Sequence, residues 1–426
     1  MHALSTIAAL TLLPAAALAA PAPVEPSSPV RLTGQVPSAS GLALEDLVKH
    51  SVERLSRVAV TPQQKRRSGK KAKRDYKIPL QNQIEPGRNF VTYSGPMKLG
   101  TPYQDLTVLF DTGSADLVVP VTAQAGGANG YLDTSRSRSF RTTSDEEVTV
   151  VYGGGSTFTG TPARERISVG GLGIIGQEFL AVSEAERADS PNWSGVLGLQ
   201  YHGASNIGGS PFLSNLISNN ALPEHLFSLY FSRTTNGSEL LLGGIDSSHY
   251  SGDLLTFPGF GSIFPYWTAI GRGYDVNGTV VDSERTFTVF DSGTSASIIH
   301  KSAAAALYAQ IPGSQLTDVT VQTMFGEAVV YQFPCVSTAS VGLAFEDANG
   351  EKQVVRMNAQ DLILQQVRRD RYGGVCYGAF LGLDYQPLGD DTFAALLGGN
   401  VHRSFYTVYS YGADGNTPSI SLATSK

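Results

Sequence analysis

Cysteine is scarce in this sequence, with two among 426 residues. Two thiols cannot supply a four-thiolate zinc site, and they exclude the cysteine-dense small scaffolds. Charged residues are also few, at 16%, against about 25% in an average soluble domain. Because 41% of the residues are apolar, a solvated disordered chain is excluded. The length suffices for a large core, and 46 glycines with 18 tyrosines and 19 phenylalanines favour a β-rich protein with many tight turns.

Two common hydrolase signatures are missing. No Gly-x-Ser-x-Gly occurs, which disfavours a serine hydrolase built on a nucleophile elbow. None of the seven histidines lies in a His-Glu-x-x-His pattern, which disfavours a zinc metalloprotease. Beyond the N-terminal region no segment is apolar enough to span a membrane, and residues 422–426 are not the hydrophobic tail of a lipid-anchor signal. We therefore expect no membrane anchor.

The N-terminus carries an apolar run, residues 4–20, which ends in the small-x-small pattern Ala17-Leu18-Ala19. This pattern predicts a secretory signal peptide over residues 1–19, cut near Ala19. One departure is that no Lys or Arg precedes the run. A membrane anchor is the alternative, but the run is shorter than the roughly 20 residues of a membrane span. We expect a secreted, extracellular protein, and retention in a vacuole or cell wall stays open.

Residues 20–74 are expected to form a propeptide. Residues 42–58 have the apolar spacing of a helix, and the basic run at 65–74 ends in the dibasic pair Lys73-Arg74, after which we expect cleavage. The alternative for such a run is a solvated tail. Residues 1–74 hold 11 Lys and Arg against 4 Asp and Glu, a net charge of +7, and the remaining 20 against 33 leave −13. The propeptide thus resembles an electrostatic lid that acid would weaken, and the acidic body argues against nucleic-acid binding.

Residues 108–119 and 288–299 form an internal repeat. Each copy has an apolar run, an Asp, a hydroxyl residue, a Gly, a second hydroxyl residue and another apolar run. The two aspartates, Asp111 and Asp291, are 180 positions apart, about half of the 352 residues from 75 to 426. The repeat therefore predicts two similar halves with one carboxylate in each.

The residues beside each Asp suggest how a carboxylate at the end of an apolar run is tolerated, since burying it alone is costly. Gly113 and Gly293 allow a tight turn and a close approach of backbone. Four hydroxyl residues can donate hydrogen bonds to the carboxylates or to nearby backbone: Thr112, Ser114, Ser292 and Thr294. The alternative is an ordinary Asp-Gly turn in each of two hairpins, which the half-length spacing of two matching copies disfavours.

The motifs Asp111-Thr112-Gly113-Ser114 and Asp291-Ser292-Gly293-Thr294-Ser295 resemble those of the pepsin-like aspartic proteases, and their surroundings resemble fungal members. Other segments similar to the family's are 151–155 at the flap tip, 195–199 in the first lobe, 241–246 with 266–267 at the join between lobes, and 396–400 with 405–409 in the second lobe. The resemblance covers essentially all of 75–426. It implies an all-β, bilobal fold with few short helices, an N-terminal lobe over 75–252, a C-terminal lobe over 253–426 and a central cleft between them.

The resemblance implies that Asp111 and Asp291 are the catalytic pair of an aspartic endopeptidase. Two carboxylates sharing a site do not both ionise easily, so one stays protonated in acid. The ionised one would activate a water that attacks the scissile carbonyl of a protein or peptide substrate, and the protonated one would polarise that carbonyl. No metal and no cofactor is needed. The alternative is an inactive protein of this fold that binds peptides or inhibits enzymes, which two intact motifs disfavour.

Supporting residues carry over by the same resemblance. Thr112 and Ser292 would brace the two loops against each other, and Ser114 and Thr294 would hydrogen-bond the outer carboxylate oxygens. The turn around these residues needs Gly113 and Gly293, as above. The propeptide would act as an intramolecular inhibitor of the resulting zymogen, removed by the enzyme itself or by a dibasic convertase.

The flap and one helix depart from the family pattern. Tyr152 and Gly153 would belong to a mobile hairpin that caps the cleft. The family usually has Trp where this chain has Val118, and that Trp supports the flap Tyr through a hydrogen bond that Val cannot supply, so the flap's hydrogen bonding must differ. Near the end of the chain His402 stands where the family often has an aromatic or aliphatic residue, and we expect a structural role for it.

Cys335 and Cys376 match the family's second-lobe disulfide, and the secretory route favours their pairing. Three acceptor patterns for N-glycosylation begin at Asn192, Asn236 and Asn277. Asn192 precedes an expected core strand and is the weakest of them. A monomer is the expected state.

Overall fold

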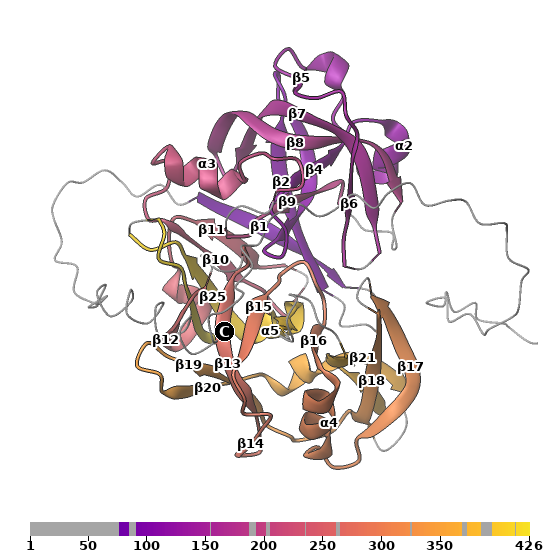
Figure 1. Cartoon of the computed structure of the whole chain (residues 1–426), viewed down its shortest axis with the longest axis vertical. Coiled ribbons are helices and arrows are strands. Elements are labelled where there is room, and N and C mark those ends of the chain that lie inside the picture. The colour runs from indigo at the N-terminus through magenta and orange to yellow at the C-terminus, as the bar shows by residue number, and fades with distance from the viewer. Residues whose placement is uncertain are drawn as a thin grey trace, which may run out of the picture. The chain divides into compact units, whose positions relative to one another are not determined.

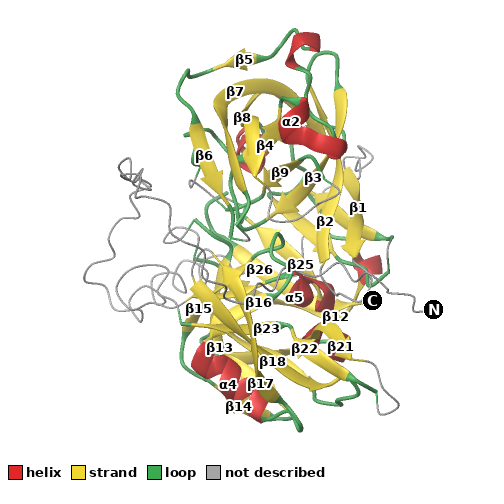
Figure 2. Ribbon diagram, turned by 90° about the vertical axis from the view of Figure 1, so that its right-hand side faces the viewer, coloured by secondary structure: helices red, strands yellow, loops and turns green. Residues whose placement is uncertain are grey.

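The computed structural model describes residues 76–84, 91–153, 155–186, 193–201, 205–234, 236–260, 265–323, 326–368, 373–384, 394–413 and 415–426. All of them lie within the unit formed by residues 36–426. The predicted signal peptide and propeptide, with the helix expected at 42–58, lie outside the described residues. Strands predominate and the helices are few and short (Figure 2), which confirms the predicted all-β class.

Within the described residues the strands form two sheets (Figure 1). The larger sheet contains 14 strands in the order β12-β26-β25-β10-β11-β1-β2-β3-β9-β4-β8-β7-β5, with β6 paired to β7. Its strands are β1 (Tyr76–Ile84), β2 (Val91–Leu99), β3 (Gln104–Asp111), β4 (Leu117–Pro120), β5 (Arg141–Thr142), β6 (Val148–Val151), β7 (Thr157–Val169), β8 (Leu172–Glu186), β9 (Gly195–Gly198), β10 (Leu226–Tyr230), β11 (Ser238–Leu242), β12 (Tyr250–Pro258), β25 (Phe405–Ser410) and β26 (Ser419–Ser425).

The second sheet contains 12 strands over the described residues, in the order β20-β19-β13-β15-β24-β16-β23-β18-β22-β21, with β14 paired to β13 and β17 to β18. Its strands are β13 (Thr268–Val276), β14 (Thr279–Val281), β15 (Thr286–Phe290), β16 (Ser297–His300), β17 (Gln315–Thr323), β18 (Gly326–Pro334), β19 (Val341–Glu346), β20 (Lys352–Arg356), β21 (Ile363–Arg368), β22 (Val375–Gly378), β23 (Phe380–Leu383) and β24 (Ala394–Leu397).

The helices are short elements between strands. They are α2 (Ala123–Gly126), α3 (Phe212–Ser218), α4 (Lys301–Ala309) and α5 (Gly399–Ser404), with single 3₁₀ turns η1 (Gly127–Asn129), η2 (Thr134–Arg136), η3 (Ser247–His249) and η4 (Ala359–Leu362). Among the described residues, no helix is both long enough and apolar enough to cross a bilayer.

The larger sheet joins the two predicted lobes. Strand β25 pairs antiparallel with β10, and β26 pairs with both β25 and β12, so strands from the end of the chain complete a sheet that begins with β1. The expected lobe boundary between residues 252 and 253 falls inside β12 of this shared sheet. Strands β1 and β26, the first and last of the described residues, are thus both part of the sheet that connects the halves.

Two matching strand arrangements hold the repeated motifs. Strand β3 becomes fully buried along its second half and ends at Asp111, and β15 is buried up to Phe290, the residue before Asp291. In the first half β9 runs parallel to β3 and antiparallel to β4. In the second half β24 runs parallel to β15 and antiparallel to β16. Each Asp therefore stands at the end of a strand that is buried between neighbours, where the backbone is well fixed.

An aromatic group packs where the halves meet. The Trp267 ring lies 5.1 Å from Tyr201, 4.9 Å from Tyr411 and 5.1 Å from Tyr409 between ring centroids. Its indole N–H donates to the Leu199 carbonyl at 2.8 Å. Because the Leu199 N–H donates in turn to the Asp111 carbonyl at 2.7 Å, this buried aromatic packing supports the backbone of the first Asp loop.

Candidate active site

The loops that follow β3 and β15 are each held by a backbone hydrogen bond to a companion segment, with the Asp as acceptor in the first loop and as donor in the second. Leu199, directly after β9, binds the Asp111 carbonyl through its N–H. On the other side the Asp291 N–H donates to the carbonyl of Leu397, the last residue of β24, at 2.9 Å. The segments 195–199 and 396–400, selected from the sequence as companions of the repeat, thus lie beside the two aspartates.

Each carboxylate accepts the same pair of hydrogen bonds. The Asp111 Oδ1 atom accepts from the Gly113 N–H at 2.8 Å, and its Oδ2 atom accepts from the Ser114 hydroxyl at 2.5 Å. In the second loop the Asp291 carboxylate accepts equivalent bonds from the Gly293 N–H at 2.9 Å and from the Thr294 hydroxyl at 2.6 Å. The structure therefore contains the contacts that the resemblance implies for Ser114 and Thr294.

The glycines of the motifs bring the two carboxylates together. A Cβ atom on Gly113 would lie 2.6 Å from the carboxyl carbon of Asp291, and a Cβ on Gly293 would collide with Oδ1 of Asp111. Neither residue has a positive φ, so what these positions require is space and not an unusual backbone conformation. Each Asp lies against the other loop's glycine, and any side chain there would push the carboxylates apart.

Two buried hydroxyls cross-link the loops, in a contact we call the grip. The Thr112 N–H donates to Ser292 Oγ at 3.0 Å, and the Ser292 N–H donates to Thr112 Oγ1 at 2.8 Å. The Thr112 hydroxyl also donates to the Phe290 carbonyl at 2.8 Å, and the Ser292 hydroxyl to the Phe110 carbonyl at 2.9 Å. Both side chains are fully buried, so these bonds hold the loops in one fixed relation.

The electrostatics of the site favour a shared proton. Asp111 and Asp291 are both buried, at 5% and 8% exposure. Burial, with the charge of Asp291 beside it, raises the pKa of Asp111 well above its ordinary value, against the opposing hydrogen bonds from Ser114 and Gly113. Two close, buried carboxylates cannot both carry a charge cheaply. The pair is therefore suited to hold one proton in acid, as a single titrating unit.

Tyr152 lies on the β6–β7 hairpin, whose turn is closed by bonds between its own N–H and the Ser156 carbonyl and between the Gly155 N–H and the Tyr152 carbonyl. Gly153 is exposed, with open space where a Cβ would stand. Burial and the negative charges of Asp111 and Asp116 raise the pKa of Tyr152 well above its usual range.

The predicted difference between this flap's hydrogen bonding and the family pattern stays a prediction, and the surroundings of Tyr152 are as follows. The Tyr152 hydroxyl is buried and has no hydrogen-bond partner among the described residues. Its ring packs edge-on against Phe158, 5.6 Å between centroids, and against an apolar cluster that contains Val118 and Trp193. Trp193 entered the sequence analysis only as the middle of a glycosylation pattern. Val118 stands where the family usually has Trp, so a large residue elsewhere was needed to fill the space beside the flap. This was the sequence signal that could have placed Trp193 there.

The remaining predicted residues are placed as follows. Cys335 and Cys376 form a disulfide with Cα atoms 5.1 Å apart, joining the end of β18 to β22. Asn236 and Asn277 are exposed, and the Asn277 Oδ1 atom accepts from the Ser340 N–H at 2.9 Å. Asn192 lies outside the described residues.

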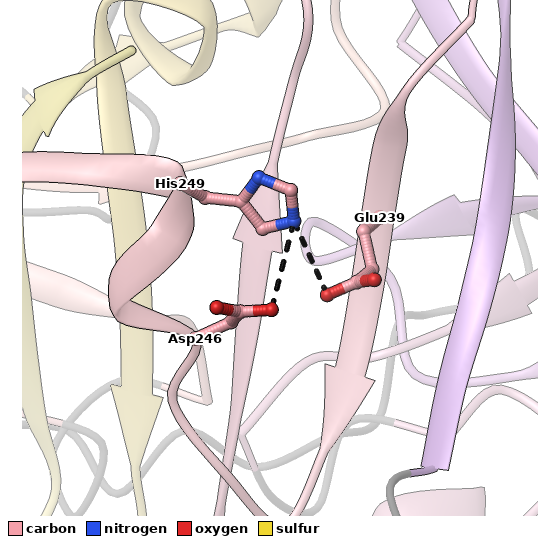
Figure 3. A group of neighbouring side chains, drawn as sticks. All are labelled: Glu239, Asp246 and His249. Atoms are coloured by element: carbon pink, nitrogen blue, oxygen red, sulfur yellow. Dashed lines mark ion pairs between the residues drawn. The ribbon is translucent and has the colours of Figure 1, made fainter.

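One cluster of ligand-type side chains lies outside the dyad. Glu239, Asp246 and His249 place an oxygen or nitrogen atom each within 4.8 Å of one another (Figure 3). Lys77 of β1 already forms ion pairs with both carboxylates, at 3.4 Å from Glu239 and closely with Asp246. The ammonium group supplies the positive charge that a cation would bring, so we assign these residues to anchoring β1.

Comparison with known proteins decides the family. A model of the eukaryotic aspartyl proteases matches residues 92–425. The chain is 32% identical to pepsin A of Sus scrofa over 335 residues, which cover 76% of this chain and 80% of that protein. It is 30% identical to pepsin A of Bos taurus over 342 residues (78% and 84%), and 32% identical to an aspartic protease of Phaffia rhodozyma over 259 residues (59% and 61%).

The chain belongs to the eukaryotic aspartyl protease family. It is an aspartic endopeptidase with the bilobal pepsin-like fold, as the two motifs predicted. The family match begins within β2 and ends within β26, so it includes both strand arrangements that carry the aspartates. His402, for which a structural role was expected, is buried on helix α5, and the Gly399 N–H of this helix donates to the Thr294 carbonyl of the second loop at 2.6 Å.

Proposed function

We propose that Asp111 and Asp291 are the catalytic dyad of an endopeptidase that works in acid. The observation that carries the proposal is the reciprocal approach of the loops. Each carboxylate lies against the glycine of the other motif, and each accepts equivalent bonds from its own loop. Such an arrangement holds two carboxylates close to each other in fixed positions, which supports their acting together on one water.

The chemistry follows from a pair that holds one proton. The ionised carboxylate takes a proton from a water held between the two, and the resulting hydroxide attacks the carbonyl carbon of the scissile peptide. The protonated carboxyl hydrogen-bonds the carbonyl oxygen as negative charge develops there. A proton then passes to the leaving amine nitrogen as the C–N bond breaks. The Ser114 and Thr294 hydroxyls hold the carboxylates in plane, and Tyr152 covers the site from the flap.

The protein is further proposed to be made as a secreted zymogen with a signal peptide over 1–19 and a propeptide over 20–74. The lobes would then span 75–252 and 253–426. The charge of +7 on residues 1–74 against −13 on the rest supports an inhibitory segment that acid releases. Extended segments of proteins, with apolar residues beside the scissile bond, are the proposed substrates of a monomeric enzyme. Asn236 and Asn277 are the proposed glycan acceptors, since both are exposed.

The dyad is tested by digestion of denatured haemoglobin or casein at about pH 3–4, where a shared proton is retained. The full chain is expressed, matured and compared with Asp291→Asn and with a pepstatin-treated sample. Asp105→Asn is the matched control, because Asp105 lies on the same strand as Asp111 but is exposed. We expect cleavage by the unmodified protein and by the control, and none in the other two samples.

Two results would count against the proposal. Maximal cleavage at neutral pH would show that no shared proton is needed. A folded, fully matured sample without cleavage would favour the inactive peptide-binding protein. N-terminal sequencing of the matured protein tests the processing separately: a start at Asp75 is expected, and a start far from it would refute the proposed propeptide boundary.

A further inference from the structure

Asp116 is a buried carboxylate at the end of the first loop, and the proposed chemistry leaves it without a role. It follows Asp111 by five positions and directly precedes β4, and it is 4% exposed. Its backbone carbonyl accepts from the Gly198 N–H, and the Ser114 carbonyl accepts from the Gln200 N–H, each at 2.9 Å. The first loop is therefore hydrogen-bonded to the residues that end and follow β9.

Three hydrogen bonds reach the Asp116 carboxylate from a later segment, residues 205–209, which we call the support. The Ser205 hydroxyl donates to Oδ1 at 2.6 Å, and Asn206 donates to Oδ2 from its N–H at 2.8 Å and from its side-chain amide at 2.9 Å. Ser205 is itself held, because its hydroxyl oxygen accepts from the Gly209 N–H at 3.0 Å. A buried charge is costly unless hydrogen bonds compensate for it, and bonds to an ionised acceptor are stronger than those between neutral groups. The carboxylate therefore holds the support against the first loop.

The first loop packs closely enough on its neighbours for a displacement at Asp116 to reach Asp111. A Cβ atom on Gly198 would lie 2.4 Å from the Ala115 carbonyl carbon and 2.5 Å from the Ser114 carbonyl oxygen, so backbone lies directly on backbone here. Ser114 also binds the Asp111 carboxylate through its hydroxyl. Because only Ala115 separates Ser114 from Asp116, the route from the support to the dyad is short.

The second loop has a buried polar side chain at nearly the same place. Ser297 follows Asp291 by six positions and is fully buried. Its hydroxyl donates to Asn400 Oδ1 at 2.8 Å, and its oxygen accepts from the Gly398 N–H at 3.1 Å. Gly398 follows β24 directly, much as Gly198 ends β9. Each catalytic loop is thus joined by a buried side chain to the segment after its companion strand, and this recurrence supports a role in holding the loops.

We propose that Asp116 is a positioning residue for Asp111, because its carboxylate holds the support against the first loop. This inference rests on the proposed dyad. The bonds described above direct the Asp116 carboxylate to Ser205 and Asn206 and not to the dyad, so it acts through Ser114. What it supplies is a set of hydrogen bonds rather than a charge, so an amide in the same place should largely replace it.

The test compares Asp116→Ala with Glu165→Ala in the full chain after maturation. Glu165 is the matched control, because it is a carboxylate of β7 that is 1% exposed and also bound by uncharged donors. These donors are the hydroxyls of Ser137 and Ser139 and the N–H of Arg166, which lie outside both catalytic loops. Both variants remove a buried, hydrogen-bonded carboxylate. We measure kcat and KM on a fluorogenic peptide in acid, together with thermal unfolding.

Asp116→Asn is the conservative variant. Its amide oxygen can accept both bonds from Asn206, and its amide nitrogen can donate to the Ser205 hydroxyl oxygen. A fourth protein, with Ser205→Ala and Asn206→Ala together, removes two of the three donors and keeps Asp116 itself. Both positions are at least partly exposed, so this protein tests the same bonds with less change to the interior.

Asp116→Ala is expected to lower kcat about tenfold or more with KM changed less than about twofold, since small misplacements of a catalytic group are costly in rate. Glu165→Ala should lose thermal stability and keep its kcat. Asp116→Asn should recover most of the lost kcat. The proposal is overturned if Asp116→Ala keeps the kcat of the control, or if Asp116→Asn is as impaired as Asp116→Ala.

If Asp116→Ala does not fold, the double variant decides. A kcat below that of Glu165→Ala supports the proposal, and an unchanged kcat overturns it. Cleavage by Asp291→Asn would instead refute the dyad itself, which keeps the two failures apart.

Discussion

Replacing His402 by Phe should make the folded protein less sensitive to acid. Burial lowers the pKa of His402, so the folded protein keeps the imidazole neutral at pH values where the unfolded chain binds a proton. A buried neutral His makes its full contribution to stability above the pKa of His in the unfolded chain, about 6.5. This contribution is lost as the pH falls from about 6.5 to the pKa of the folded protein. Inside this window the free energy of unfolding falls by about 1.4 kcal/mol per pH unit.

The assay is urea unfolding between pH 7 and pH 4 in the Asp291→Asn background, which removes self-digestion. Other titrating groups are common to both proteins and cancel when the two slopes are subtracted. The protein with His402 should lose about 1.4 kcal/mol more per pH unit than His402→Phe. The His402→Phe variant is expected to be less stable at pH 7, because the Tyr409 hydroxyl loses its hydrogen-bond partner. The test therefore uses the change of unfolding free energy with pH and not its absolute value. Parallel curves would refute a buried neutral His402.

Three further predictions concern the dyad, the grip and the disulfide. A carboxyl whose pKa is raised by folding costs stability as the pH climbs from about 3.9 toward the folded value, so Asp111→Asn should be more stable at pH 7, relative to pH 4, than the unmodified protein is. Urea unfolding of both proteins at the two pH values checks this, and the same difference in both proteins contradicts it. Thr112→Val leaves the Ser292 N–H and the Phe290 carbonyl without the hydroxyl that pairs them. At about 1–3 kcal/mol for each unpaired group, the free energy of unfolding should fall by about 2–6 kcal/mol. A loss below about 0.5 kcal/mol in denaturant unfolding would mean that the grip is dispensable. Replacing Cys335 and Cys376 together by Ser should cost up to about 4 kcal/mol for their separation of 41 residues; the denaturant midpoint should fall to that of the reduced protein, and an unmoved midpoint rejects the estimate.

The sequence was sufficient for the fold class and for the partners within each motif. A carboxylate after an apolar run needs nearby donors and close backbone, so Asp111 pointed to Gly113 and Ser114 within the same turn, and the second copy repeated the argument. The bracing of Thr112 by Ser292 came from the family resemblance, because no local pattern connects residues 180 positions apart.

The parts that the sequence could not provide depend on packing across long separations. The cluster of Arg233, Asp361 and Arg403 joins three distant segments by ion pairs of 2.5 and 3.0 Å. Charged residues spaced that far apart have no periodicity to reveal them. The contact of His402 with Tyr409 spans seven positions across a helix-to-strand turn whose angle is set by the shared sheet. Such contacts follow from the tertiary arrangement and not from local preference.

The shared sheet has a consequence for the order in which the protein is synthesised. Strands β10 and β12 leave the ribosome long before β25 and β26, with which they pair. The loop of Asp291 likewise lacks its supports until Leu397 and Gly399 have emerged. A nascent chain that already carries both proposed catalytic aspartates therefore still lacks part of the contacts that support their loops. Translation itself delays proteolytic activity until nearly the whole body has been made, and this safeguard operates independently of any inhibitory segment.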